Sequence, residues 1–417
     1  MAPPTILIIS QVYVPDPASV GQHIADAAEE LARRGYRVVV YASANGYDDP
    51  TRKYPRREAL RGVDVRRLPF SSFGKGSITV RLLAQSIFVV LAFVRGLFTR
   101  NLASILVSTS PPFCGVVGAW LSKIRRVPVT YWLMDLNPDQ MLALGKARPD
   151  QVSVRVFELF NRIILRQASN IVMMDRFMLD RVQKKGVDVA SKTTIAPPWP
   201  HDEGTRSIAH SVNPFRSTHN LEGKFVVMYS GNHSPANPLT TLLDAAERLR
   251  DDPRLVFLFI GGGGGKKEVD ERIASDHNAS NLRSLPYQPL DQIQYSLSAA
   301  DVHVVSIGNE VVGIVHPCKV YGAMAVSRPV LLLGPSPSHV SDLIATHSIG
   351  WHVAHGDVDG AVRTLQTMLE MSADQLHAMG DRAARVVSTD LGRDKLCGEF
   401  CDVITHDLAP APASSSD

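Results

Sequence analysis

Short apolar runs alternate with amphipathic helical patterns along most of the chain. In the first half the pattern predicts a helix from about residue 20 to residue 34 and strands at 6–10, 37–43, 63–68, 104–109, 127–134 and 170–175. These runs are continuously apolar, as is typical of strands that are covered on both faces of a parallel sheet. Strands that alternate with helices predict a doubly wound α/β fold.

A proline-rich, turn-rich stretch at 196–215 interrupts this pattern, and we interpret it as a linker between domains. The alternation then restarts, with a helix predicted at 239–250 and strands at 225–231, 255–265, 281–287, 301–307 and 329–334. We therefore expect Rossmann-like domains at 1–205 and 206–390. A final helix at 391–407 is expected to pack back toward the first domain, and 408–417 has the composition of a disordered tail.

Two such domains in tandem would place two sets of strand ends opposite each other. Ligands of doubly wound sheets bind just beyond the carboxyl ends of the strands. The predicted architecture is therefore α/β, with two tandem Rossmann-like, doubly wound domains facing across a cleft that holds the active site.

Charge divides the chain, although the formal net charge is only +3. Residues 1–200 carry 27 Lys/Arg and 15 Asp/Glu, whereas residues 201–417 carry 17 and 26, so a basic half precedes an acidic half. The four cysteines form no CxxC pair and are expected to be reduced thiols. The N-terminal apolar run is too short for a signal peptide, and the uncharged segment 82–94 is too short to span a bilayer.

Several residues of the first half follow predicted strands. Gly21 and His23 begin the first helix, where a glycine permits close approach of a ligand or simply allows a tight turn. Asp135 follows the strand 127–134, and Asp139 comes shortly after it. A carboxylate at that position either faces the cleft or caps the next helix.

The second half carries glycines and positive charges at its strand ends. Gly231, Asn232 and His233 end one strand, and five consecutive glycines followed by two lysines end the next, without the GxxxxGK[ST] pattern of a P-loop. Glu310 and Gly313 follow a third strand, and Lys319 begins a predicted helix. A lysine there opposes the helix dipole, so it indicates either an anionic partner such as a diphosphate or a solvated side chain.

With these stretches the chain resembles GT-B glycosyltransferases of glycosyltransferase family 4, and within it the bacterial cell-surface polysaccharide subgroup. The matching motifs are VPDPASVGQHIADAAEEL, TSPP at 109–112, YWLMDLNPD, YSGN at 229–232 and VGIVHPCKVYGAMAVSRPVL. The resemblance implies a retaining, hexosyltransferase-type enzyme that moves a sugar from a nucleotide diphosphate donor to a lipid-linked or polysaccharide acceptor. A UDP-sugar is expected in preference to a GDP-sugar, as a co-substrate, and no metal or other cofactor is expected.

The resemblance also implies roles for individual residues. Asp135, Glu310 and Lys319 are the expected catalytic residues, and His23 and Asp139 are expected to bind the acceptor. The expected donor-binding residues are Gly21, Gly231, Asn232, Tyr287, Gly313, Ile314, Lys319 and Tyr321. Four positions depart from the family pattern, since Met134, Asn232, Asn237 and Gly322 replace a His, an Arg, a Lys and a Glu that many members carry. Lys319 is therefore the expected source of positive charge for the leaving diphosphate.

The basic residues of the first half also indicate a binding partner. Residues 52–126 hold 14 Lys/Arg and only two acidic residues, and the apolar segment 82–94 lies among them. Basic charge beside an apolar helix suits an anionic membrane surface, which predicts a cytoplasmic protein associated peripherally with the inner face of the cell membrane. The alternative is a solvated basic face over an ordinary core helix. No nucleic-acid-binding motif supports a nucleic-acid partner.

Two other functions remain open at this point. A GT-B nucleotide-sugar 2-epimerase would need clustered acid/base carboxylates and histidines in the cleft. A non-catalytic, membrane-bound partner in a polysaccharide assembly complex would fit the missing Arg, Lys and Glu.

Overall fold

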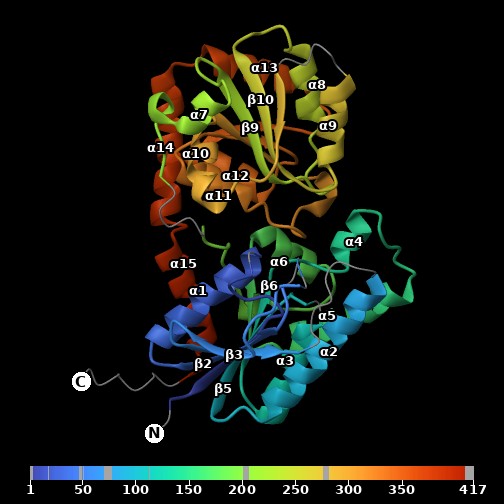
Figure 1. Cartoon of the computed structure of the whole chain (residues 1–417). Coiled ribbons are helices and arrows are strands. Elements are labelled where there is room, and N and C mark those ends of the chain that lie inside the picture. Colours follow the sequence, from blue (N-terminus) through green and yellow to red (C-terminus); the bar gives the residue numbers. More distant parts are fainter. Residues whose placement is uncertain are drawn as a thin grey trace, which may run out of the picture. The chain divides into compact units, whose positions relative to one another are not determined.

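The computed structural model describes residues 3–16, 18–46, 49, 51–69, 78–111, 113–200, 206–275 and 281–408, with the backbone alone for 78–82 and 290. The chain divides into two compact α/β units (Figure 1). Unit 1 comprises Met1–His201 and Arg393–Asp417, and unit 2 comprises Asp202–Gly392. Of the tail that we expect to be disordered, residues 409–417 lie outside the described residues, as do parts of the basic segment 52–126.

Unit 1 contains a mixed sheet with the strand order β3-β4-β2-β1-β5-β6-β7-β8. The strands are β1 (Thr5–Ile9), β2 (Arg37–Ser43), β3 (Arg57–Leu60), β4 (Val63–Leu68), β5 (Leu102–Ser108), β6 (Val129–Leu133), β7 (Asn170–Met173) and β8 (Thr193–Ile195). Every pair is parallel except β3 with β4 at one edge. The apolar pattern missed β3 and β8, because both are short edge strands without a buried residue.

Helices cover both faces of this sheet. The helices of unit 1 are α1 (Ser19–Arg33), α2 (Ile78–Leu97), α3 (Cys114–Arg125), α4 (Asp139–Ala143), α5 (Val152–Gln167), α6 (Arg176–Gln183) and α15 (Arg393–Thr405), with the 3-10 turn η1 (Ala190–Lys192). Figure 1 shows α1 and α15 on one face, and α2, α3 and α5 on the other. The last helix packs within unit 1, where Ser104 Oγ donates to the carbonyl of Ile404 at 3.3 Å and Arg34 pairs with Asp402 at 2.6 Å.

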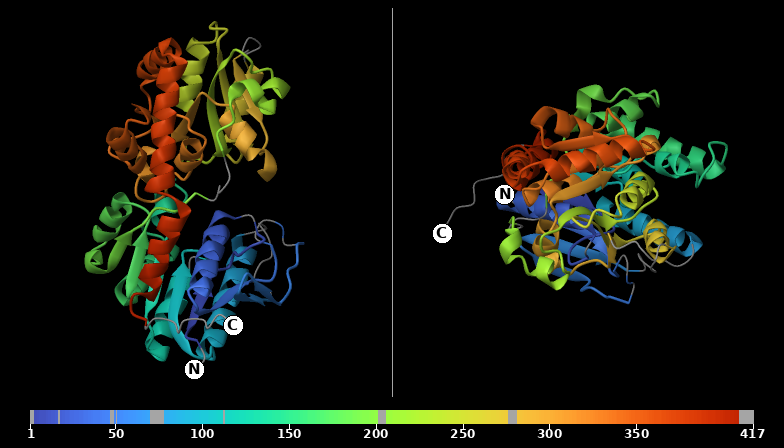
Figure 2. Two further views of the ribbon diagram at one scale, coloured as in Figure 1. Left: turned by 90° about the vertical axis from the view of Figure 1, so that its left-hand side faces the viewer. Right: turned by 90° about the horizontal axis from the view of Figure 1, so that it is seen from above.

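Unit 2 contains a parallel sheet with the strand order β11-β10-β9-β12-β13-β14 (Figure 2). The strands are β9 (Phe225–Asn232), β10 (Leu255–Gly262), β11 (Leu282–Leu285), β12 (Val302–Ser306), β13 (Val330–Leu333) and β14 (Gly350–Val353). The sequence pattern missed β14, since its four residues GWHV include only one that is buried.

The helices of unit 2 enclose an apolar core on each face of the sheet. They are α7 (Pro214–Thr218), α8 (Thr240–Arg248), α9 (Lys266–Ser275), α10 (Ile293–Ser298), α11 (Lys319–Ala325), α12 (His339–His347), α13 (Val358–Glu370) and α14 (Ala373–Thr389), with 3-10 turns η2 (His210–Val212), η3 (Leu290–Gln292) and η4 (Asn309–Val311). Alternate residues of β9 serve the two cores, since Val227 and Tyr229 face α8 and α13 whereas Val226 and Met228 face α7.

Both sheets are doubly wound, which confirms the predicted fold class. In unit 2 the chain passes from β9 to β10 on one side, and β12 lies on the other side of β9. In unit 1, β1 lies between β2 and β5 in the same way. Such a reversal of strand order opens a crevice at the carboxyl ends of the strands, where ligands of these folds bind. Within the described residues, no helix has the length and apolar character needed to cross a membrane.

Candidate functional site

The candidate site of unit 2 lies where β9, β10 and β12 end. Gly231 of β9 and Gly261 of β10 are paired across the sheet and adopt φ values of +126° and +124°. Side chains rarely adopt such values, and a Cβ atom on Gly261 would overlap the carbonyl oxygen of Gly231. Glycine at both positions therefore lets the two strand ends approach each other and leaves their edge open to a ligand.

Lys319, the first residue of α11, extends over this edge. A Cβ atom on Gly231 would lie 2.8 Å from Lys319 Cε, so the absence of a side chain at Gly231 makes room for the lysine stem. Lys319 Nζ lies 5.3 Å from the centre of the Tyr229 ring, a cation–π contact. Tyr229 is buried in β9, and its hydroxyl donates to the carbonyl of Asn232 at 2.8 Å.

The Lys319 ammonium has no hydrogen bond or ion pair to any residue that the structure describes. The residue is half-buried, and desolvation lowers the pKa of its amine to about 8 despite the opposing effect of Cys318. A positive charge removed from water without an anionic partner is unfavourable. This position is therefore suited to an anionic ligand that supplies the missing partner.

Asn232 and His233 follow Gly231 and have different environments. The Asn232 side chain is exposed at the end of β9, where a ligand can reach it. His233 is only 1% exposed, and its Nδ1 lies 3.1 Å from the carbonyl oxygen of Gly231. Desolvation, together with the charge of Lys266, lowers the pKa of the His233 imidazole to about 4. His233 is therefore a neutral, buried ring that supports the strand end.

The two lysines after the glycine run also differ. Lys266 is buried, and its Nζ donates to the carbonyl oxygens of Phe259, Gly261 and Leu285 at 3.2, 3.0 and 2.5 Å. Lys267 is exposed and pairs with Glu271 at 3.4 Å. The structural role of Lys266 escaped the sequence analysis, because no sequence pattern distinguishes a lysine that binds carbonyls from one that binds phosphate.

The other predicted donor residues of unit 2 lie in loops that follow its strands. Tyr287 is 59% exposed, and its hydroxyl donates to the carbonyl of Gly262 at 3.3 Å. Glu310 is exposed in η4 after β12. Gly313 adopts a φ of +70°, and the Ile314 side chain is buried, so these two residues offer mainly backbone to a ligand.

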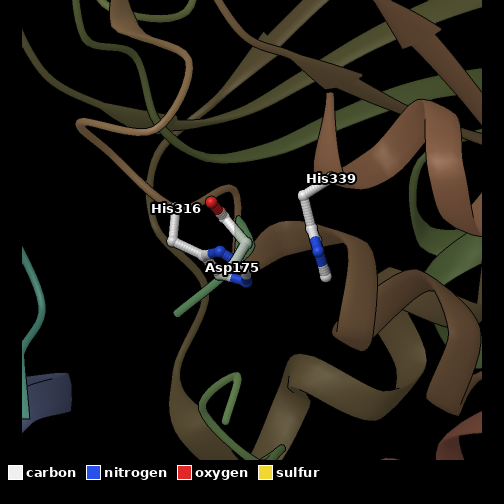
Figure 3. Close-up of side chains that lie close together, drawn as sticks. All are labelled: Asp175, His316 and His339. Atoms are coloured by element: carbon white, nitrogen blue, oxygen red, sulfur yellow. The ribbon is translucent and has the colours of Figure 1, made fainter. Parts of the chain in front are cut away.

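Tyr321 lies within α11 and is 2% exposed. Its hydroxyl is 2.7 Å from His316 Nε2 and 3.0 Å from His339 Nε2. Figure 3 shows both histidines. In unit 1, Asp175 caps α6 by accepting from the Met178 amide at 2.9 Å. The sequence analysis missed the two histidines, which lie 23 residues apart.

The acidic candidates of unit 1 occupy different surroundings. Asp135 follows β6, and its side chain is exposed, although the protein around it raises the pKa of the carboxyl to about 6 by desolvation. Water reaches this carboxyl, which keeps it available to a ligand. Asp139 instead pairs with Lys185 at 2.6 Å, and Glu158 pairs with the same ammonium at 2.5 Å.

Gly21 and His23 contribute to packing within unit 1. Gly21 is the third residue of α1, and a Cβ atom there would lie 3.1–3.2 Å from atoms of Val12 and Tyr13. His23 is 3% exposed, with Nε2 2.8 Å from the carbonyl oxygen of Trp199 and Nδ1 2.9 Å from that of Ser19. Their ligand-binding roles remain predictions.

The residues gathered at the edge of unit 2 could bind a nucleotide. Lys319 offers an ammonium that no described residue pairs with, Asn232 an exposed amide and Tyr287 an exposed ring. A phosphate would pair with the ammonium, and a base would stack on the ring.

Comparisons with known proteins identify two family domains along the chain. The glycosyl transferase 4-like domain matches residues 19–199, and the glycosyl transferases group 1 domain matches residues 213–386. The chain is similar to a putative colanic acid biosynthesis glycosyl transferase, WcaI of Escherichia coli (strain K12), with 26% identity over 355 residues that span 82% of this chain and 86% of the relative.

Two solved structures share the fold. HepE from Anabaena, solved in complex with UDP, superposes with a TM-score of 0.70 at 15% identity and covers 97% of this chain and 100% of that one. A sucrose-phosphate synthase from Thermosynechococcus elongatus superposes with a TM-score of 0.74 at 15% identity, over 97% and 98% of the two chains.

These findings support an enzyme of the transferase class, and they do not favour the epimerase or the non-catalytic partner. Two family models follow one another in chain order, the curated relatives are named as glycosyltransferases, and the solved structures share the two-domain fold. The chain therefore belongs to the GT-B glycosyltransferases, in the bacterial polysaccharide group of glycosyltransferase family 4.

Proposed function

We propose that this glycosyltransferase moves a sugar from a nucleotide diphosphate donor to a lipid-linked or polysaccharide acceptor of the cell envelope, with retention at the anomeric carbon. The observation that carries the proposal is the half-buried Lys319 ammonium, which has no anionic partner among the described residues. HepE was solved with UDP and with UDP-glucose, which favours a UDP-sugar over a GDP-sugar. The Escherichia coli relative is named for colanic acid biosynthesis, which favours an envelope glycan as product.

In the proposed reaction, Lys319 stabilises the negative charge that develops on the departing diphosphate. The bond between the anomeric carbon and the diphosphate oxygen breaks, a bond to the acceptor oxygen forms, and the acceptor hydroxyl loses its proton. Asp135 is the proposed recipient of that proton, because its carboxyl has a pKa of about 6 and is ionised near neutral pH. A positioned lysine supplies charge stabilisation of the kind that a metal gives in other enzymes, so we propose transfer without a metal.

The diphosphate, the base and the sugar of the donor are each proposed to contact particular residues. Gly231 lies against the Lys319 side chain, and Gly231 and Asn232 are proposed to bind the diphosphate. Tyr287 is proposed to contact the base. The sugar is proposed to lie against Glu310 and the backbone of 313–314. From unit 1, Gly21 is proposed to approach the donor, and His23 and Asp139 to lie near the acceptor.

A panel of nucleotide sugars tests this function directly. Thermal unfolding is measured with each nucleotide sugar, and transfer of radiolabelled sugar to a lipid extract is measured with and without EDTA. A donor at 100 times its Kd should stabilise the protein by about 2.7 kcal/mol. We expect one UDP-sugar to stabilise the protein and to support transfer that EDTA does not abolish. If no donor stabilises the protein and none supports transfer, the proposal is refuted. Loss of transfer in EDTA would refute its metal-free form.

The acceptor is proposed to reach unit 1 at a membrane surface. The surface consists of apolar side chains that are 47–79% exposed, namely Leu83, Val90, Val94, Phe98, Trp120 and Ile124. Those of α2 recur at intervals of seven and four residues along one side of the helix, and α3 joins them through the Phe93–Trp120 ring contact at 6.2 Å. An apolar strip of this kind on a protein surface indicates an interaction site.

Exposed basic residues lie on the same helices as this apolar strip, or directly after them. Arg95, Arg100, Lys123 and Arg126 are exposed along α2, α3 and the turns that follow them. Each basic residue near an anionic bilayer contributes about 1 kcal/mol, so the four contribute about 4 kcal/mol before the apolar side chains insert. Apolar side chains among the basic ones favour a lipid surface over nucleic acid. We accordingly propose a cytoplasmic enzyme bound peripherally to the inner face of the cell membrane.

Flotation with lipid vesicles tests this surface. The chain should float with vesicles that contain phosphatidylglycerol and much less with phosphatidylcholine alone. Val94→Ser with Phe98→Ser should reduce flotation about tenfold or more, because two inserting side chains are lost. Ile195→Ser, at a residue of β8 that is 42% exposed, is the control that should float like the wild type. Equal flotation of all variants would refute the membrane surface.

A further inference from the structure

Three side chains connect the turn that carries Lys319 to the start of α12. His316 precedes α11, Tyr321 lies in its first turn, and His339 is the first residue of α12. The Tyr321 hydroxyl lies 2.7 Å from His316 Nε2 and 3.0 Å from His339 Nε2. The two imidazole rings, shown in Figure 3, have centroids 4.4 Å apart. We refer to His316, Tyr321 and His339 as the triad.

The triad is a single hydrogen-bonded unit inside unit 2. Tyr321 and His316 are 2% and 8% exposed, and His339 is half-buried. A tyrosine hydroxyl carries one proton, so it can donate to the Nε2 atom of only one imidazole. The second contact is then a hydrogen bond only if the other imidazole donates its own Nε2–H to the hydroxyl oxygen. Loss of one member therefore alters the hydrogen bonding of the other two.

Lys319 lies between two members of the triad in sequence. The amide of Cys318 donates to the carbonyl of His316 at 3.0 Å, and the amide of Tyr321 donates to the carbonyl of Cys318 at 3.1 Å. The backbone at Lys319 is thus fixed on both sides by residues whose side chains share one hydrogen bond. The Lys319 side chain contacts the Tyr229 ring and makes no hydrogen bond to any described residue, so the location of its ammonium depends on where this turn lies.

We propose that the triad positions Lys319 against the donor diphosphate, an inference that rests on the proposed function. In this role His316, Tyr321 and His339 are positioning residues, and they influence donor binding only through the lysine. Tyr321, which the family resemblance suggested as a direct donor contact, acts instead from within the core of unit 2. The competing interpretation is that the three side chains only stabilise the fold.

A double-mutant cycle on UDP binding separates these interpretations. Tyr321→Phe removes only the hydroxyl, Lys319→Met removes only the ammonium, and the third variant combines both changes. Titration calorimetry with UDP measures binding, and thermal unfolding measures stability. Side chains that act through one another show coupling of about 0.5–3 kcal/mol. We therefore expect Tyr321→Phe to weaken UDP binding about fivefold to twentyfold in the wild type and less than about twofold when Lys319 is already Met.

Further variants keep the test decisive. His339→Gln retains a donor near the place of Nε2 and should bind UDP within about twofold of the wild type, whereas His339→Ala should resemble Tyr321→Phe. If Tyr321→Phe does not fold, His339→Ala takes its place in the cycle with Lys319→Met. Tyr295→Phe, in α10 and outside the triad, is the control for loss of a tyrosine hydroxyl and should not change UDP binding.

The outcomes also distinguish the two proposals. If the folded wild type binds UDP but the changes at Tyr321 and Lys319 are additive, the triad only stabilises the fold and this inference is wrong. The same holds if Tyr321→Phe lowers the unfolding temperature without affecting UDP binding. If the wild type binds no nucleoside diphosphate, the proposed function itself fails, and the positioning role fails with it.

Discussion

Replacing Lys319 with Met should change stability and donor binding in opposite directions. Methionine has nearly the length of lysine and can lie along Gly231 and the Tyr229 ring, as the lysine stem does. The substitution therefore removes the ammonium while it keeps most of the packing. In the free protein that ammonium is half-buried without an anionic partner among the described residues, so its loss should be favourable.

The pKa of Lys319 gives the size of the effect on stability. Burial lowers this pKa from its ordinary value of 10.5 to about 8. A full conversion at about 1.4 kcal/mol per unit gives a cost of about 3 kcal/mol, which partial solvent access reduces to about 1–2 kcal/mol. Since the folded pKa lies below the unfolded one, this cost is fully present below about pH 8 and disappears as the pH rises toward the unfolded value.

Binding should change in the other direction. A hydrogen bond to a charged group contributes about 1.5–3 kcal/mol, so loss of the ammonium should weaken UDP binding about 10-fold to 150-fold. Chemical denaturation near neutral pH measures stability, and titration calorimetry with UDP measures binding. We expect Lys319→Met to be more stable than the wild type and to bind UDP more weakly. A less stable variant with normal UDP affinity would contradict the proposal that the Lys319 ammonium binds the diphosphate.

Three other results are expected. UDP-glucose binding should fall about tenfold between about pH 7 and pH 9, because only the ammonium form of Lys319, with its pKa of about 8, pairs with the diphosphate. A flat pH profile of the calorimetric affinity would argue against that pairing. Gly231→Ala should nearly abolish UDP binding and destabilise the fold by about 1–3 kcal/mol, since φ is +126° and the new Cβ would meet Lys319 Cε at 2.8 Å. A variant that keeps its UDP affinity and its stability would be inconsistent with the close approach of Lys319 to Gly231. Lys266→Met should destabilise unit 2 by about 2 kcal/mol or more in denaturant titrations, whereas Lys267→Met should change its stability little. Equal effects of the two substitutions would show that the three carbonyl contacts of Lys266 are unimportant.

Much of the fold could be predicted from the apolar pattern, since both sheets bury their central strands on two faces. The strands Arg37–Ser43 and Val63–Leu68 have the predicted bounds, and the helix Lys319–Ala325 begins at the predicted residue. The strands that escaped prediction are short edge strands, of which β3 has no buried residue and β14 only one. Edge strands form because a neighbouring strand offers unpaired backbone groups, and this is a property of the folded sheet.

The candidate site was less predictable than the fold. Glycine after a strand and lysine at a helix start could be identified in the sequence, and the structure brings Gly231 and Lys319 into contact. The sequence could not show that His233 and Lys266 are buried under the glycine turn. Nor could it show that Tyr321 faces inward, toward a histidine 18 residues further along the chain. Such roles depend on tertiary contacts, because the same side chain binds a ligand when exposed and supports the backbone when buried.

Net charge alone would argue against an anion site in the second half of the chain. Residues 201–417 carry 17 basic and 26 acidic residues, yet the proposed diphosphate site lies there. Exposed charges more than about 8 Å away are largely screened at physiological ionic strength, whereas a half-buried charge in contact with its ligand is not. In the proposed site, one ammonium that no described residue pairs with would therefore outweigh a larger number of distant carboxylates. The proposed membrane surface likewise depends on local features, because exposed basic residues lie on the same helices, α2 and α3, as exposed apolar side chains.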